Sequence, residues 1–146
     1  MGAPIQTEEE LDLLLKHSGE ALPLLLDTGH LAFAGGDMLR VIDKHHARIN
    51  HVHTKDIRRE VVDALDRTKD SFLDAVLRGA FTVPGDGSLD FEAIAKCLAS
   101  YGYEGWFVVE AEQDPVPNPP PEMARVGHQQ LTRALAVAGY EVVGST

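Results

Sequence analysis

Short apolar runs alternate along this chain with longer stretches in which apolar residues recur every three or four positions. The runs have the length and composition of buried parallel strands; they lie at residues 23–27, 49–53, 81–83 and 106–110. The periodic stretches favour helices, around residues 11–15, 38–42, 56–67, 71–77, 91–98 and 122–138. Repeated alternation of strand and helix predicts a parallel α/β fold of about four βα units.

The spacing of the expected strands narrows the architecture. Their ends lie at positions 27, 53, 83 and 110, which are 26, 30 and 27 residues apart. Each interval has about the length of one βα unit, so the pattern indicates a (β/α) barrel or a doubly wound sheet. A glycine-rich phosphate loop follows none of these runs, which leaves nucleotide binding without support.

Three of the expected strands end in residues that can bind a metal ion. Asp27 ends the first, His53 lies at the end of the second, and Glu110 ends the fourth. The carboxyl ends of parallel strands meet at one edge of a sheet, where chemistry collects in such folds. A mixed set of nitrogen and oxygen ligands suits Mn²⁺, Co²⁺, Zn²⁺ or Mg²⁺.

Other polar residues accompany these three. His30 follows Asp27 by three positions, Lys55 shares a strand face with His53, and Glu112 shares one with Glu110. Asp114 follows shortly after. Each residue alone has an ordinary interpretation as a turn former, a half-buried histidine or a solvated charge. Their coincidence at the ends of regularly spaced strands favours a functional site.

Composition and net charge limit the classes of molecule that we expect this chain to bind. The chain has 146 residues, enough for one domain, and a formal net charge of −10. Such a balance argues against nucleic-acid and membrane binding, and is compatible with cations or neutral small molecules. Cys97 is the single cysteine, which excludes an internal disulfide and favours a cytoplasmic location.

The tripeptide Asp27-Thr28-Gly29 after an apolar run also matches the signature of aspartic proteases. Those enzymes are built almost entirely of β-strands. The helical periodicity of most of this chain contradicts that interpretation.

Four segments together resemble one enzyme family. Residues 24–37, 51–56, 81–87 and 108–115 are similar to inosose (2-keto-myo-inositol) dehydratases, which belong to the xylose-isomerase-like TIM-barrel superfamily. The resemblance implies a divalent-metal-dependent lyase of inositol catabolism that eliminates water from a keto-polyol. It implies Asp27, His53 and Glu110 as metal ligands, with Mn²⁺ or Co²⁺ as the expected ion. It implies His30, Lys55 and Glu112 as acid and base candidates, without ranking them.

The resemblance covers only part of a barrel. A complete (β/α)₈ barrel needs ~250 residues, and this chain resembles the second half, with residues 1–146 as a single half-barrel domain and the N-terminal half missing. The first glutamate ligand of the superfamily has no counterpart before position 23. We therefore expect weak metal binding and weak or no activity for the chain alone. Exposed strand edges predict a homo-oligomer or association with the missing half.

Two alternatives stay open. The same metal residues occur in sugar isomerases and epimerases of the superfamily, which differ in their acid and base residues. The second alternative is that the chain is a non-catalytic half-barrel that needs a partner chain.

Overall fold

The computed structural model describes residues 5–143 and contains a three-stranded parallel sheet. Its strands are β1 (Leu24–Asp27), β2 (Ile49–Thr54) and β5 (Trp106–Val109), in the order β1-β2-β5. All three are parallel. The parallel α/β class expected from the sequence is confirmed, and the sheet does not close into a barrel. The helices are α1 (Glu8–His17), α2 (Thr28–Phe33), α3 (Met38–His45), α4 (Arg59–Asp63), α5 (Phe72–Leu77), α6 (Phe91–Ser100) and α7 (Pro120–Val137), with a 3₁₀ turn η1 (His46–Arg48).

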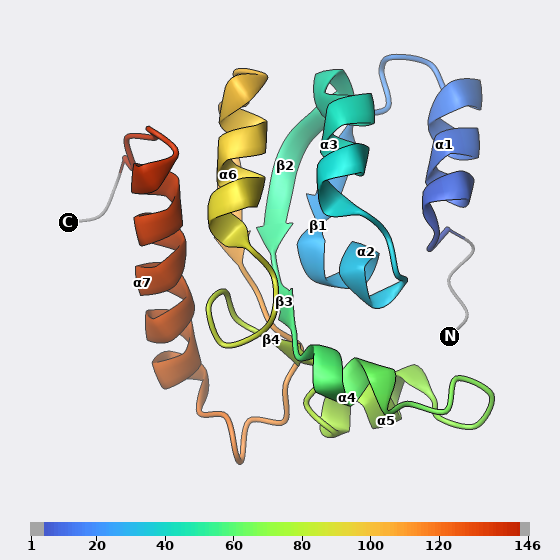
Figure 1. Ribbon diagram of the computed structural model, residues 1–146, viewed down its shortest axis with the longest axis vertical. Helices are drawn as coiled ribbons and strands as arrows, with labels where there is room; N and C mark the ends of the chain where they lie inside the picture. Colours follow the sequence, from blue (N-terminus) through green and yellow to red (C-terminus); the bar gives the residue numbers. More distant parts are fainter. Residues whose placement is uncertain (1–4, 144–146) are drawn as a thin grey trace.

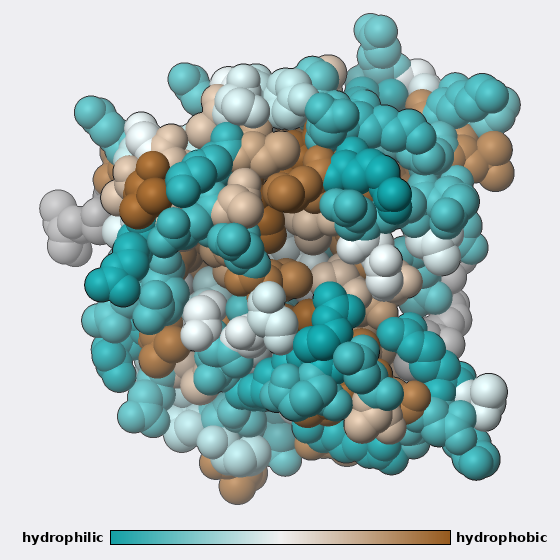
Figure 2. Space-filling view, viewed as in Figure 1, coloured by the Kyte–Doolittle hydropathy of each residue, from teal (hydrophilic) through white to brown (hydrophobic). Residues whose placement is uncertain are grey.

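Three helices cover one face of the sheet. Helices α3, α6 and α7 stand side by side along the strands, while α4 and α5 lie across the far end (Figure 1). Between helices and sheet lies the main core, in which Ile42, Val52 and Leu98 are almost completely buried. The outer surface on this side is mainly hydrophilic (Figure 2). Within the described part of the chain, no helix combines the length and apolar composition needed to cross a membrane.

We expected about four parallel strands, one for each βα unit. The parallel sheet has three among the described residues, because one expected strand lies elsewhere. Residues 81–83, expected to form a strand of the same sheet, contribute instead to β4 (Phe81–Thr82), which pairs antiparallel with β3 (Asp56–Ile57) in a separate two-stranded sheet. The segment is apolar because Phe81 packs in a second core with Ile57 and Ala75. A short buried strand therefore has the same apolar sequence pattern whether it belongs to the parallel sheet or to the separate antiparallel one.

Helix α2 was not expected, because Thr28-Gly29 has the composition of a turn. Asp27 begins it as its N-cap: its Oδ1 accepts a hydrogen bond from the His30 backbone N–H at 2.9 Å. Helix α1 was expected, and its capping box between Thr7 and Glu10 is formed.

The face of the sheet opposite the helices is open. In the strand register Leu25 pairs with His51, and His51 with Trp106. Leu25 is 46% exposed and Trp106 is 74% exposed. Within residues 5–143, β1 and β5 each pair only with β2. The sheet therefore has two free edges and an uncovered face, as expected of a partial barrel.

Candidate metal centre

Asp27, His53 and Glu110 meet at one end of the sheet. Asp27 and His53 are paired in register on β1 and β2, and Glu110 directly follows β5. One ligand atom from each residue lies within 4.8 Å of the other two. His53 Nδ1 is 3.7 Å from Asp27 Oδ2 and 2.6 Å from Glu110 Oε2. The three side chains converge because they lie on the same face of the sheet, at the carboxyl ends of neighbouring strands.

The donor atoms of this group are oriented toward one another. Asp27 Oδ1 caps α2, which leaves Oδ2 facing His53. Glu110 Oε2 is buried and accepts no hydrogen bond from any described residue, although His53 Nδ1 is only 2.6 Å away. A buried carboxylate oxygen without a donor is uncommon. Its lone pair and that of an imidazole nitrogen, aimed at one region, fit a divalent cation.

Lys55 lies beside this group and is almost entirely buried. Its Nζ is 3.4 Å from Asp27 Oδ2, 3.8 Å from Glu110 Oε2 and 3.3 Å from Glu112 Oε2. Only 1% of the side chain is exposed. A buried cation normally requires such partners, since desolvation of a lone charge is very unfavourable. We call Asp27, His53, Lys55, Glu110 and Glu112 the carboxylate cluster.

His30 borders the carboxylate cluster on its accessible side, next to Glu112. His30 Nε2 is 3.0 Å from Lys55 Nζ and 3.6 Å from Glu112 Oε2. The side chains of His30 and Glu112 are 44% and 36% exposed. Among the three acid and base candidates, these two are therefore reachable from solvent and Lys55 is not. Their catalytic role stays a prediction.

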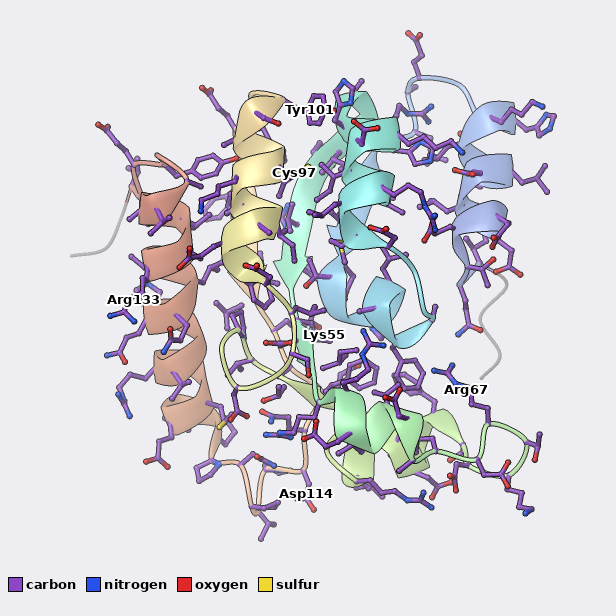
Figure 3. The ribbon with its side chains drawn as sticks, viewed as in Figure 1. Lys55, Arg67, Cys97, Tyr101, Asp114 and Arg133 are labelled. Carbon is purple, nitrogen blue, oxygen red and sulfur yellow. The ribbon has the colours of Figure 1, made fainter. Side chains whose placement is uncertain are left out.

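Asp114 does not reach the carboxylate cluster. Figure 3 shows it on the loop before α7, away from Lys55. Its Oδ1 accepts a hydrogen bond from the Val116 backbone N–H at 3.0 Å, which stabilises the local turn. Asp114 therefore lies outside the group of side chains that the ends of the three strands bring together.

Asp56 has a structural role that the sequence did not reveal. It is completely buried, and its carboxylate accepts hydrogen bonds from the backbone N–H groups of Ile57, Gly85, Ser88 and Leu89 at 2.8–3.2 Å. Burial raises the pKa of Asp56 above its usual range, against the opposing effect of these N–H groups. Asp56 thereby fixes the turn at residues 84–88 next to the end of the sheet.

A second polar network links this turn to the segment after β5. Arg58 donates to Asp86 at 2.5 Å and to the Thr82 hydroxyl at 3.2 Å. Gln113 donates to the same hydroxyl at 3.1 Å. Gln113 directly follows Glu112, so the network ties this part of the carboxylate cluster to the two-stranded sheet of β3 and β4. Sequence patterns contained no signal for it, because its members come from three distant segments.

Taken together, these side chains can hold a cation and exchange protons next to it. Three donors of mixed nitrogen and oxygen type point to one region, and an accessible imidazole and carboxylate lie within reach. Such a combination suits proton abstraction next to a carbonyl, with a divalent ion as Lewis acid.

A family profile and the sequences of known relatives assign this chain to the same family. The family profile described as "Xylose isomerase-like TIM barrel" matches residues 1–134. The chain is 49% identical over 142 residues to the rhizopine catabolism protein MocC of Rhizobium meliloti, covering 97% of this chain and 44% of that protein. It is 52% identical over 132 residues to an inosose dehydratase of Geobacillus thermodenitrificans, covering 90% of this chain and 44% of the relative. The chain thus spans less than half the length of these relatives.

Solved structures agree on the fold. A xylose isomerase-like TIM barrel/4-hydroxyphenylpyruvate dioxygenase fusion protein superimposes with a TM-score of 0.67 at 22% identity, covering 91% of this chain and 20% of the other. The IOLI protein, solved with a zinc atom, also gives a TM-score of 0.67, at 15% identity, covering 93% of this chain and 46% of the other.

Proposed function

Because the chain belongs to the xylose isomerase-like TIM barrel family, we propose that it carries the metal-binding part of a dehydratase that eliminates water from 2-keto-myo-inositol or a closely related keto-polyol. The relatives named inosose dehydratase, at about half identity over most of this chain, support this substrate class. Their names, and that of the rhizopine catabolism protein MocC, also support a role in the breakdown of cyclic polyols.

The observation that carries the proposal is the convergence of Asp27, His53 and Glu110 within 4.8 Å at the ends of three parallel strands. These residues would hold the ion through Asp27 Oδ2, His53 Nδ1 and Glu110 Oε2. A divalent cation bound there supplies a Lewis acid that polarises a ketone and makes the adjacent C–H bond more acidic. Mn²⁺ or Co²⁺ is our first choice of ion, with Mg²⁺ and Zn²⁺ as alternatives; the zinc atom of the IOLI structure supports a divalent ion in this fold.

The elimination needs one proton acceptor and one proton donor. A base removes the proton α to the ketone, the electron pair forms a carbon–carbon double bond, and the β-hydroxyl leaves as water after receiving a proton. Glu112 is our candidate for the base and His30 for the acid, because both are accessible and adjacent. Lys55 holds positive charge behind them and keeps the carboxylates in place.

We further propose that the active form includes additional chain along the free edge of β1. A cavity of about 460 Å³ separates that edge from α1, and it is lined by leucines of both elements. Asp27 and His30 lie among its lining residues, so a strand placed there parallel to β1 would end next to the carboxylate cluster. The additional chain is the remaining half of a barrel or a second copy of this chain. A reducing cytoplasm, in which Cys97 stays a free thiol, is part of the proposal.

Turnover is the test. The chain is assayed with 2-keto-myo-inositol and Mn²⁺ or Co²⁺, alone and co-expressed with the part of the Geobacillus relative that lies outside the match. Loss of one water from the substrate is followed by mass spectrometry. We expect little turnover by the chain alone and clear turnover by the complemented protein, abolished by Glu110→Gln.

Two results would contradict the proposal. The first is a stable complemented protein that binds metal and leaves keto-inositol unchanged while it isomerises or epimerises sugars. The second is a chain that, alone, matches the full-length relative, which would remove the need for additional chain.

A further inference from the structure

We infer that Thr28 and Gly29, at the start of α2, form a clamp that holds Lys55 inside the carboxylate cluster. The inference rests on the proposed function, since it concerns residues that position a group of that site. It assigns a role to the Asp27-Thr28-Gly29 tripeptide that differs from the protease signature it matches in sequence.

Gly29 is required by a close approach and not by its own backbone. Its φ lies outside the left-handed region, where glycine is favoured, so other residues could adopt this conformation. A Cβ at this position, however, would lie 2.6 Å from Lys55 Cγ, 2.7 Å from Lys55 Cβ and 2.9 Å from Lys55 Cδ. These distances are far below ordinary van der Waals contact. The missing side chain of Gly29 is therefore the space that the Lys55 stem occupies.

Thr28 fixes the main chain from which that stem starts. Its hydroxyl donates to the Lys55 carbonyl at 2.6 Å and also lies 3.3 Å from the His53 carbonyl. The residue is completely buried. A buried hydroxyl bond of this kind contributes to order mainly because the acceptor would otherwise lack a partner. Thr28 thus holds the end of β2, and Gly29 directs the side chain of Lys55 along α2.

The clamp delivers the ammonium group to a defined place. Lys55 Nζ lies 3.4 Å from Asp27 Oδ2, 3.3 Å from Glu112 Oε2 and 3.0 Å from His30 Nε2, and 5.6 Å from the centre of the Phe81 ring. A long lysine side chain normally keeps its charge in water. Here the stem runs so close to the Gly29 backbone that an added Cβ would meet three of its carbon atoms. Displacement of the stem would move the charge out of the carboxylate cluster.

Competitive acetylation of lysines tests the clamp directly. The purified chain is treated with limiting acetic anhydride, and modification of Lys55 is measured by peptide mass spectrometry relative to Lys96, which is on the surface. In the unaltered chain we expect Lys55 to be strongly protected. Gly29→Ala is expected to raise its relative labelling about tenfold, because the stem must leave its slot. Gly19→Ala is the matched control: a Cβ there would meet no described atom within 4 Å.

A second pair of variants covers the case in which Gly29→Ala does not fold. Thr28→Val keeps the shape and removes the donor, whereas Thr28→Ser keeps the donor. We expect Thr28→Val to raise Lys55 labelling and Thr28→Ser to restore protection, with Lys96 unchanged in both. A merely structural defect would expose all lysines equally and would not be rescued by serine.

The inference is overturned if Lys55 stays protected in a folded Gly29→Ala chain, or if Thr28→Val and Thr28→Ser label alike. The readout is the position of Lys55 and not turnover. A protein that proves inactive on keto-inositol but shows the expected labelling would therefore contradict the proposed function and support the clamp. An active protein in which the variants leave Lys55 labelling unchanged would support the proposed function and contradict the clamp.

Discussion

Replacement of Lys55 by methionine removes the buried positive charge while nearly conserving the volume of the side chain. The ammonium group has three carboxylate oxygens at 3.3–3.8 Å. With an effective dielectric constant of about 20, each contact corresponds to roughly 4–5 kcal/mol of Coulomb attraction. Desolvation of Lys55 offsets much of this sum, and Glu110 and Glu112 are partly screened by solvent. Breaking a buried ion pair by removing one partner costs about 3–5 kcal/mol.

We therefore expect Lys55→Met to lower the free energy of unfolding by about 3–5 kcal/mol in the absence of metal. Urea denaturation followed by circular dichroism, in the presence of a chelator, measures this loss. Lys96→Met is the control, because Lys96 is exposed and, within residues 5–143, forms an ion pair with Glu92 of the same helix alone; its effect should stay below about 0.5 kcal/mol.

Added Mn²⁺ makes the prediction sharper. An ion held by Asp27, His53 and Glu110 would replace part of the positive charge that Lys55 supplied. A ligand at about 100 times its dissociation constant stabilises the folded state by about 2.7 kcal/mol. Mn²⁺ should consequently reduce the stability difference between Lys55→Met and the unaltered chain. Equal stability of the two chains in chelator would refute the reasoning, since it would mean that the carboxylates do not depend on Lys55 for neutralisation.

Three further predictions concern the surroundings of the site and the core. Asp56→Ala removes a buried carboxylate that accepts from four backbone N–H groups, and it should lower the free energy of unfolding by about 3 kcal/mol or more in urea denaturation. The exposed Asp63→Ala should change that free energy little, and equal effects of the two substitutions would contradict the role of Asp56. Burial raises the pKa of Tyr103 to about 12, so the folded chain retains that proton longer than the unfolded one. The associated stability is fully present below about pH 10 and is lost as the pH rises toward 12, by up to about 3 kcal/mol; Tyr103→Phe should abolish this part of the pH dependence, and an unchanged slope would be inconsistent with it. Side-chain hydrogen bonds to Lys44 and His45 lower the pKa of Asp12, so the stability they contribute is present above the ordinary pKa of an aspartate and is lost as the pH falls. Asp12→Asn should flatten the acid side of the stability curve, as measured by thermal unfolding between about pH 3 and 6, and a curve that is unaltered by this substitution would show that the contact contributes nothing.

Much of the candidate site was predictable because it depends on two regularities of strands. Side chains two residues apart share a face, and the ends of parallel strands share an edge. These rules bring Asp27, His53 and Glu110 together from positions 26 and 57 residues apart in the chain. The fold class followed from the same alternation of apolar runs and periodic stretches.

Other features depend on contacts that leave no local pattern. The apolar run at residues 81–83 has the composition of a barrel strand, and only its antiparallel partner, β3, shows that it belongs to a separate sheet. Thr28-Gly29 has the composition of a turn, but both residues lie in α2, which Asp27 caps, and both contact Lys55. The ranking of His30 and Glu112 above Lys55 as accessible groups required side-chain exposure, which a sequence does not contain.

Calorimetric titration of the chain with Mn²⁺ tests the central claim most directly. The account predicts weak binding of one ion per chain, with the affinity reduced at least about tenfold by each of Asp27→Asn, His53→Gln and Glu110→Gln, and unchanged by Asp63→Asn on the surface. Equal affinity in all five proteins, or binding of Mn²⁺, Co²⁺ and Zn²⁺ by none of them, would contradict it.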